Sequence, residues 1–205
     1  CAILNIDSVR CTQFCSTGQG GFTMSVKVIT VGREFGSGGR SVGKAVAAAL
    51  GWDYYDQELV RHVAEKTGFA ERYIEETGEY SASKSRLAYA FSSVGSPEVM
   101  NGLSASDYLW TVQRKVILDL AEKGNCVIVG RCADLVLTGQ DVDCLSLFIC
   151  APFEWRVHHR MELENLDEKA ARALVEKTDA QREKYYTHYT GRRPSAWRRK
   201  IRSAR

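Results

Sequence analysis

Short apolar runs rich in β-branched residues alternate with helix-like segments along most of this chain. Three of these runs, at 26–32, 126–130 and 144–150, have the length and composition of strands buried on both faces. The segments between and after them show helical spacing of apolar residues or helix-capping signals. This alternation predicts an α/β fold, in which helices flank a parallel sheet. The other expected elements are a short strand at 53–56 and helices at 41–50, 57–67, 104–123, 152–163 and 167–188.

The composition is that of one globular domain with a sizeable core. The 205 residues are 44% hydrophobic and 26% charged with only 3 prolines, which excludes a disordered or collagen-like chain. The longest nearly apolar run, 145–153, is far shorter than the roughly 20 residues that cross a bilayer, so we expect no membrane partner. The 7 cysteines include no C-x-x-C pair, which favours free thiols in a reducing cytoplasm over disulfides or zinc.

The net charge of +3 comes from one end of the chain. Residues 192–205 contain several basic residues and no acid, whereas residues 24–191 contain more acids than bases. A basic tail by itself binds phosphates without sequence specificity. We therefore expect no specific nucleic-acid partner.

Both ends of the chain differ from its middle. Residues 1–23 show little periodicity and are predicted to be a disordered leader, and 192–205 are predicted to be a disordered basic tail. The domain is expected to span 24–191. Within it, the serine-rich segment 78–106 interrupts the alternation of strands and helices, which is typical of a functional flap or an insertion.

The strongest chemical signal is the glycine-rich segment 32–41, G-R-E-F-G-S-G-G-R-S, which joins the first strand to the first helix. Glycines let backbone N–H groups curl around an anion, and the N-terminus of the next helix adds partial positive charge. Arg40 and Ser41 lie where a basic side chain can reach β- and γ-phosphates and a hydroxyl can hold Mg²⁺. The match to G-x-x-x-x-G-K-[ST] is incomplete, because the glycines at 32 and 39 are too far apart and an arginine replaces the lysine. A strand-to-helix turn that binds no ligand is the alternative interpretation.

Four segments in order resemble the cytidylate kinase-like family of P-loop nucleoside monophosphate kinases. The first, ITVGREFGSGGRSVGKAVAAALGWDYYDQELV, contains the glycine-rich turn, and the others are NCVIVGRCAD, APFEWRVHHRM and KTDAQREKYYTHYTG. The resemblance covers about residues 25–191. It implies a three-layer P-loop kinase fold with an acceptor-binding insertion at about 78–106 and a lid at about 152–188.

The resemblance also implies roles for residues around the two nucleotides. ATP would be held by Gly36, Ser37, Gly38, Gly39, Arg40 and Ser41, with Ser41 on Mg²⁺. Arg131 would fork onto the acceptor phosphate and Asp134 would contact its base or a metal-bound water, at a strand end where open parallel sheets place ligands. Asp56 would orient a sugar hydroxyl or Mg²⁺. The alternatives are a surface salt bridge for Arg131 and a helix N-cap for Asp56.

The expected lid supplies the remaining candidates. Arg156 and Arg160 are four apart and share a helix face, and Asp179 and Arg182 are three apart on the next helix. The resemblance implies that Arg160, Asp179 and Arg182, together with Arg40, are catalytic, because lid closure brings arginines to the moving phosphoryl group and expels water. Solvated charged helices are the alternative. The tyrosines at 185, 186 and 189 are expected to pack, and the basic residues at 84 and 86 are candidates for contacting the acceptor.

The chain departs from the family pattern after residue 191. Family members continue with a further strand and helix, whereas 192–205 show no strand pattern. We therefore expect the C-terminal strand to be missing, which would leave an unpaired sheet edge.

The function that these patterns favour is ATP- and Mg²⁺-dependent phosphoryl transfer to a nucleoside monophosphate, with CMP or dCMP as the acceptor by resemblance. Two alternatives stay open. One is a nucleotide-binding regulatory or interaction module with little or no turnover, which the replaced lysine and the altered C-terminus motivate. The other is a P-loop kinase for a different small acceptor. The sequence does not indicate an oligomeric state.

Overall fold

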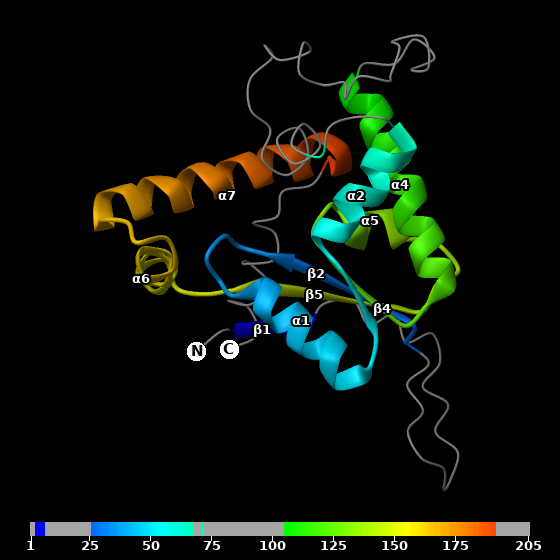
Figure 1. Ribbon diagram of the computed structural model, residues 1–205, viewed down its shortest axis with the longest axis horizontal. Helices are drawn as coiled ribbons and strands as arrows, with labels where there is room; N and C mark the ends of the chain where they lie inside the picture. Colours follow the sequence, from blue (N-terminus) through cyan, green and yellow to red (C-terminus); the bar gives the residue numbers. More distant parts are fainter. Residues whose placement is uncertain (1–2, 7–25, 68–70, 72–104, 192–205) are drawn as a thin grey trace, which may run out of the picture.

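A computed structural model describes residues 3–6, 26–67, 71 and 105–191 of the chain (Figure 1). Its centre is a five-stranded sheet in the order β1-β5-β2-β4-β3. The strands are β1 (Ile3–Ile6), β2 (Val28–Arg33), β3 (Asp53–Tyr55), β4 (Cys126–Val129) and β5 (Cys144–Cys150). Strands β2 to β5 are parallel, which confirms the predicted parallel sheet, and β1 pairs antiparallel with β5.

Helices flank this sheet. They are α1 (Gly39–Leu50), α2 (Gln57–Thr67), α4 (Ala105–Lys123), α5 (Ala133–Leu137), α6 (Phe153–Glu164) and α7 (Glu168–Thr190). Figure 1 shows α1 on one side of the sheet and α2, α4 and α5 on the other. The five expected helices are confirmed to within two residues at each end. The short α5 was not predicted, because five residues contain too few positions to reveal a helical period.

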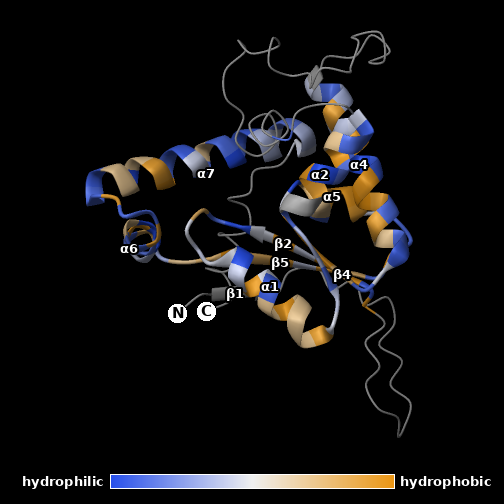
Figure 2. Ribbon diagram, viewed as in Figure 1, coloured by the Kyte–Doolittle hydropathy of each residue, from blue (hydrophilic) through white to orange (hydrophobic). Residues whose placement is uncertain are grey.

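The two faces of the sheet build separate cores. Val28 packs under α2 and α4, whereas its neighbour Ile29 packs with Ala47 of α1, as the alternation of side chains along a strand requires. Figure 2 shows hydrophobic residues gathered where α4 and β4 meet their neighbours. Gly43 lets α1 approach closely, since a Cβ there would lie 3.1 Å from Val129 Cγ2.

A third, smaller core joins α6 and α7, which we call the lid helices after the role that the sequence predicts for them. Val157, Ala171 and Val175 are buried in it. Phe35, from the glycine-rich turn, packs against the same cluster. The side chain of Asp167 caps α7 by accepting from Ala170 N–H at 2.7 Å. The turn and the lid helices are therefore packed together by apolar contacts.

The N-terminal part of the chain corrects the prediction of a disordered leader. Ile3–Ile6 form β1, which lies along β5 with Ile3 opposite Cys150 and Ile6 opposite Leu147. The prediction is therefore wrong for these four residues, and 7–23 lie outside the described residues. The edge of β5 that faces away from β2 is paired by this strand.

Other predictions fall outside the described residues. These are the basic tail, the missing C-terminal strand and most of the serine-rich segment, including its basic residues at 84 and 86; only 105 and 106 of that segment are described, where α4 begins. Within the described ranges, no helix combines the length and the apolar character that a membrane crossing demands.

Candidate phosphate-binding site

The glycine-rich turn presents backbone N–H groups at the carboxyl end of β2. Its residues at 36 and 38 have positive φ angles of 79° and 80°. The first intrahelical bond of α1 runs from Val42 N–H to the Gly38 carbonyl at 3.0 Å. The N–H groups of Gly39, Arg40 and Ser41 precede that bond, so they have no acceptor within the helix and point from its positive end.

Three glycines of the turn, at 36, 38 and 39, have different surroundings. A Cβ at Gly38 would meet nothing within 4 Å, so the space beside this residue is open to a ligand. A Cβ at Gly36 would lie 3.0 Å from the Arg156 carbonyl oxygen, and one at Gly39 would lie 2.6 Å from Arg33 Cβ. Only Gly38 therefore borders open space, and the other two let the turn pack against α6 and Arg33.

Ser37 lies inside the turn and faces the protein. Its hydroxyl is buried and lies 2.9 Å from the Glu34 carbonyl and 3.0 Å from the Ile149 carbonyl. The N–H of Ser37 also donates to the Glu34 carbonyl, at 3.4 Å. The predicted ATP ligand is thus placed where it ties the turn to β5.

Arg40 and Asp56, predicted on opposite nucleotides, form an ion pair. Arg40 Nε lies 2.7 Å from Asp56 Oδ2, and Arg33 Nη2 approaches the other oxygen at 3.9 Å. The Arg40 side chain is 51% exposed, so it has room to move. The pKa of the neighbouring Tyr54 is raised by burial and by the negative charge of Asp56.

A cavity of about 440 Å³ lies beyond the carboxyl ends of β2 and β4, between the sheet and α7. Predicted site residues on its wall are Arg131, Asp134, Asp179 and Arg182. Aromatic residues on the wall include Phe148, Phe153, Tyr185 and Tyr186. The cavity therefore combines arginines with flat apolar surfaces at the place where open parallel sheets bind ligands.

Arg131 stands in an unusual backbone conformation at the rim of β4. Residues 130, 131 and 132 all have positive φ, and Arg131 and Cys132 are not glycines. The Arg131 carbonyl accepts from Gln113 Nε2 at 3.3 Å, and the same nitrogen donates to Tyr185 Oη at 2.9 Å. Burial raises the pKa of Tyr185, so its hydroxyl stays protonated. These contacts hold the strained turn in place.

Asp134 is oriented by a tyrosine of α7. Tyr186 Oη donates to Asp134 Oδ2 at 2.8 Å. The tyrosine at 186 was expected to pack; its hydroxyl also binds a candidate substrate-binding carboxylate. Tyr189 does pack, with its ring stacked 4.2 Å from Trp110.

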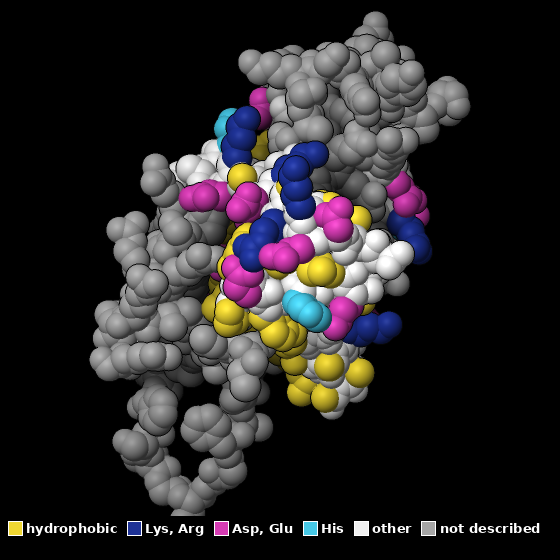
Figure 3. Space-filling view, turned by 90° about the vertical axis from the view of Figure 1, so that its left-hand side faces the viewer, with side chains coloured by type: hydrophobic (Ala, Val, Ile, Leu, Met, Phe, Trp, Pro, Cys, Tyr) yellow, Lys and Arg dark blue, Asp and Glu magenta, His cyan; other side chains and the backbone are white. Residues whose placement is uncertain are grey.

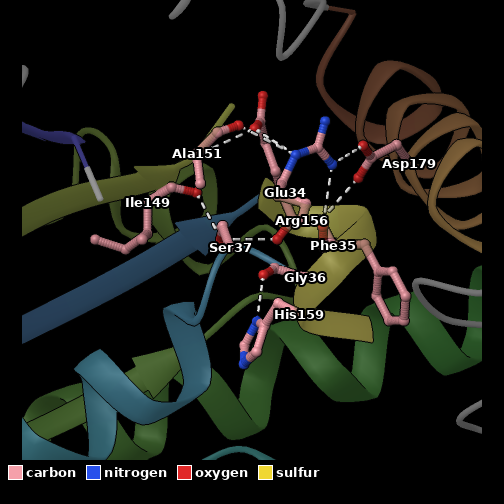
Figure 4. Close-up of polar contacts among 9 residues, drawn as sticks. All are labelled: Glu34, Phe35, Gly36, Ser37, Ile149, Ala151, Arg156, His159 and Asp179. Carbon is pink, nitrogen blue, oxygen red and sulfur yellow. Dashed lines mark hydrogen bonds and ion pairs between the residues drawn. The ribbon is translucent and has the colours of Figure 1, made fainter. Parts of the chain in front are cut away.

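A buried ion-pair network ties the turn to the lid helices (Figure 4). Arg156 is 2% exposed and lies between Glu34 Oε2, at 3.3 Å from its Nε, and Asp179 Oδ2, at 2.5 Å from its Nη1. His159 Nδ1 donates to the Gly36 carbonyl at 2.7 Å. Sequence reasoning noticed the spacing of Arg156 but gave no role to it, to Glu34 or to His159. The signal for Glu34 was its place between the strand end and the first turn glycine.

Arg160 and Arg182 meet at the ring of Phe35. Their guanidinium carbons lie 4.5 Å and 5.4 Å from its centroid, within the range of cation–π attraction. Arg182 lines the cavity, whereas Arg160 pairs with Glu164 on its own helix. These two predicted catalytic arginines are therefore close together, but of the two only Arg182 is on the cavity wall.

Mg²⁺ would have few protein ligands here. Among the described residues, no three His, Cys, Asp or Glu side chains cluster as a metal site. Ser41 is exposed in the first turn of α1, beside the open N–H groups. This fits a cation held mainly by nucleotide phosphates and water, as Mg²⁺ is in kinase sites.

The outer face of the lid helices carries charges of both signs (Figure 3). Arg172, for example, lies 3.0 Å from both Glu154 Oε1 and Glu168 Oε1. Such pairs give this face a surface of mixed charge.

Comparison with known proteins identifies the family to which the chain belongs. The fold is α/β, and a glycine-rich turn joins a parallel strand to a helix at the carboxyl end of the sheet. The family model described as "Cytidylate kinase-like family" matches residues 28–199, so the chain belongs to the cytidylate kinase-like family. The match extends beyond 191, the predicted end of the domain.

One solved structure supports the fold. It is entitled "Crystal structure of uncharacterized protein from Eubacterium ventriosum ATCC 27560" and is 26% identical, with a TM-score of 0.57 and 83% of each chain covered. No curated protein matches the chain significantly.

Proposed function

We propose that the protein transfers a phosphoryl group from ATP to a nucleoside monophosphate, with CMP or dCMP as the acceptor. The observation that carries the proposal is the open glycine turn at the N-terminus of α1, next to a cavity lined by Arg131 and Arg182. Membership of the cytidylate kinase-like family supports the reaction class. The free thiols of the four described cysteines are in keeping with a reducing cytoplasm.

The turn is the donor site in this proposal. The N–H groups of Gly39, Arg40 and Ser41 would bind the β- and γ-phosphates, and Gly38 leaves room for them. Bound Mg²⁺ supplies charge neutralisation on the phosphates. The Ser41 hydroxyl would be its protein ligand. Arg40 would leave Asp56 and reach the phosphates, which its exposure permits.

The cavity is the acceptor site. Arg131 would bind the acceptor phosphate with its planar fork, and Asp134, oriented by Tyr186, would accept from a base amino group. Asp56 faces two arginines, so a contact with a sugar hydroxyl requires Arg40 to move first.

Transfer needs positioning and charge stabilisation more than proton abstraction. The attacking oxygen of the acceptor phosphate is already an anion, so no general base is required. Arg160 and Arg182 would move from the Phe35 ring to the transferring group as the lid helices close and exclude water.

The test is an acceptor panel with ATP–Mg²⁺ in a coupled assay for ADP. CMP or dCMP should stimulate ADP release more than the other nucleoside monophosphates or small hydroxylated acceptors do. Stimulation by a different acceptor would correct the substrate, and the absence of stimulation by any acceptor would contradict the proposal.

A second candidate is a nucleotide-binding module without turnover. The ion pair between Arg40 and Asp56 favours it, since it turns the basic side chain of the motif onto a protein carboxylate. ATP binding by calorimetry without ADP release would support this alternative.

A further inference from the structure

Phe35 connects the glycine turn to both lid helices through its backbone and its ring. Its N–H donates to Asp179 Oδ1 at 2.8 Å, and its carbonyl accepts from Arg156 Nη1 at 3.0 Å. The ring packs against the small core of α6 and α7. Gly36 and Ser37 follow directly, so a shift of Phe35 would be passed on to the start of the turn (Figure 4).

Arg156 is committed to protein partners. Besides its two carboxylate partners and the Phe35 carbonyl, it donates from Nε to the Ala151 carbonyl at 3.2 Å. A buried guanidinium is costly unless carboxylates and hydrogen bonds compensate it. Glu34, from the end of β2, and Asp179, from α7, provide that compensation. Arg156 therefore joins the strand end to the lid.

Asp179 contacts the turn with both carboxylate oxygens. Oδ1 accepts from the Phe35 N–H, and Oδ2 accepts from Arg156, which in turn holds the Phe35 carbonyl. These three hydrogen bonds form a closed ring that runs from the Phe35 N–H through Asp179 and Arg156 to the Phe35 carbonyl. The side chain is 28% exposed, so it lies at the rim of the network.

We propose that Asp179 and Arg156 are positioning residues that hold the turn in its ATP-binding conformation without touching ATP. The inference rests on the proposed function and revises the role predicted for Asp179. If the pair only positions the turn, breaking it weakens phosphate binding but leaves the transfer step itself almost unchanged. The effect then appears in Kd and KM for ATP and spares kcat.

The experiment compares Asp179→Asn, Arg156→Lys and the double variant in the full chain. ATP–Mg²⁺ affinity is measured by calorimetry, and turnover is measured separately with the best acceptor. Asp179→Asn keeps the size of the side chain but removes its charge, and should raise Kd and KM for ATP about tenfold with kcat within about twofold. The Kd of the double variant for ATP should be no higher than that of the single variant with the lower affinity, because both changes break one network.

Two further variants control the comparison. Glu168→Gln removes a carboxylate of the same helix whose partner is the exposed Arg172, and should leave the affinity for ATP unchanged. Asp179→Glu keeps the charge and should bind ATP more tightly than Asp179→Asn. Thermal melts check whether Asp179→Asn and Arg156→Lys fold. If either does not, Asp179→Glu is the test: an effect on the Kd for ATP supports the inference, and an effect on kcat contradicts it.

A fall in kcat with unchanged Kd would overturn the inference, since Asp179 would then act on the reacting groups. Unchanged ATP affinity in the folded Asp179→Asn variant, or additive effects in the double variant, would overturn it as well. A wild-type chain that binds no ATP would refute the proposed function and the inference together, which distinguishes the two failures.

Discussion

Two turns at the same end of the sheet are built in opposite ways. The turn after β2 places glycine at 36 and 38, where φ is positive, and offers backbone N–H groups. The turn after β4 places Arg131 and Cys132 in the same region of φ, although both carry side chains. A left-handed residue with a Cβ costs roughly 1–2 kcal/mol. The first turn therefore exposes its backbone without strain, whereas the second is strained at residues that carry side chains.

The largest effect should come from the basic residue that the first turn adds to its backbone donors. Arg40→Ala should reduce turnover by about a hundredfold or more, because one preorganised donor to a developing charge is worth that much. Its side chain is half exposed, so the melting temperature should change little. Arg40→Lys, which keeps the charge, should retain more turnover than Arg40→Ala. Equal turnover in Arg40→Ala and the wild type would remove Arg40 from the mechanism.

Alanine at the two positive-φ glycines of the first turn should separate the effect on packing from the effect on ATP binding. Gly36→Ala combines a left-handed backbone with a contact 3.0 Å from the Arg156 carbonyl, and should lower the free energy of unfolding by about 3 kcal/mol. Gly38→Ala meets open space, so only the backbone cost of roughly 1–2 kcal/mol remains. Its methyl group would occupy the phosphate space, so ATP binding should weaken more than stability does. Denaturant unfolding and calorimetry measure the two quantities, and equal destabilisation would contradict the assignment.

Replacing Arg131 of the second turn by glycine or by alanine should also separate binding from stability. Arg131→Gly and Arg131→Ala both remove the guanidinium, and both should raise the KM for the acceptor about tenfold. Arg131→Gly should be more stable than Arg131→Ala by about 1 kcal/mol, since φ is +57° at this position. If the acceptor KM does not change, Arg131 serves only to build the turn.

The smallest effect should come from removing the hydrogen bond of Tyr186 to Asp134, just after the second turn. Tyr186→Phe removes the hydroxyl that donates to Asp134 at 2.8 Å, and loss of one such bond is worth about 1 kcal/mol. The KM for the acceptor should rise about fivefold, whereas the KM for ATP should stay the same. A matching rise in the KM for ATP would show that the two turns are not independent.

Local patterns were enough to predict most of the fold but not the contacts of the site. The parallel strands and five helices follow from apolar spacing and glycine stops, which act over a few residues. The bond between Phe35 and Asp179 joins residues 144 positions apart, and no local pattern encodes such a pairing. The same holds for Arg156, whose spacing was visible but whose partners were not. The strand at Ile3–Ile6 is four residues long and is defined by its pairing with β5.

The site residues divide in the same way. The turn at 32–41 was located correctly because glycine spacing is a property of the segment itself. Arg131 and Asp134, expected at the acceptor site, and Asp179 and Arg182, expected in the lid, all line one cavity. The inward-facing Ser37 and the ion pair of Arg40 with Asp56 depend on packing between β2, β5 and β3, which sequence patterns do not describe.

The length of α7 has a mechanical consequence. The helix has 23 residues, and the stack of Tyr189 on Trp110 fixes its C-terminal end. Asp179 lies ten residues before Tyr189 on this helix, or about 15 Å along its axis. A tilt of about 10° around the stack would move Asp179 by about 2.6 Å. That displacement exceeds the tolerance of a hydrogen bond, so a small rocking of α7 would release the glycine turn while the aromatic stack stays intact.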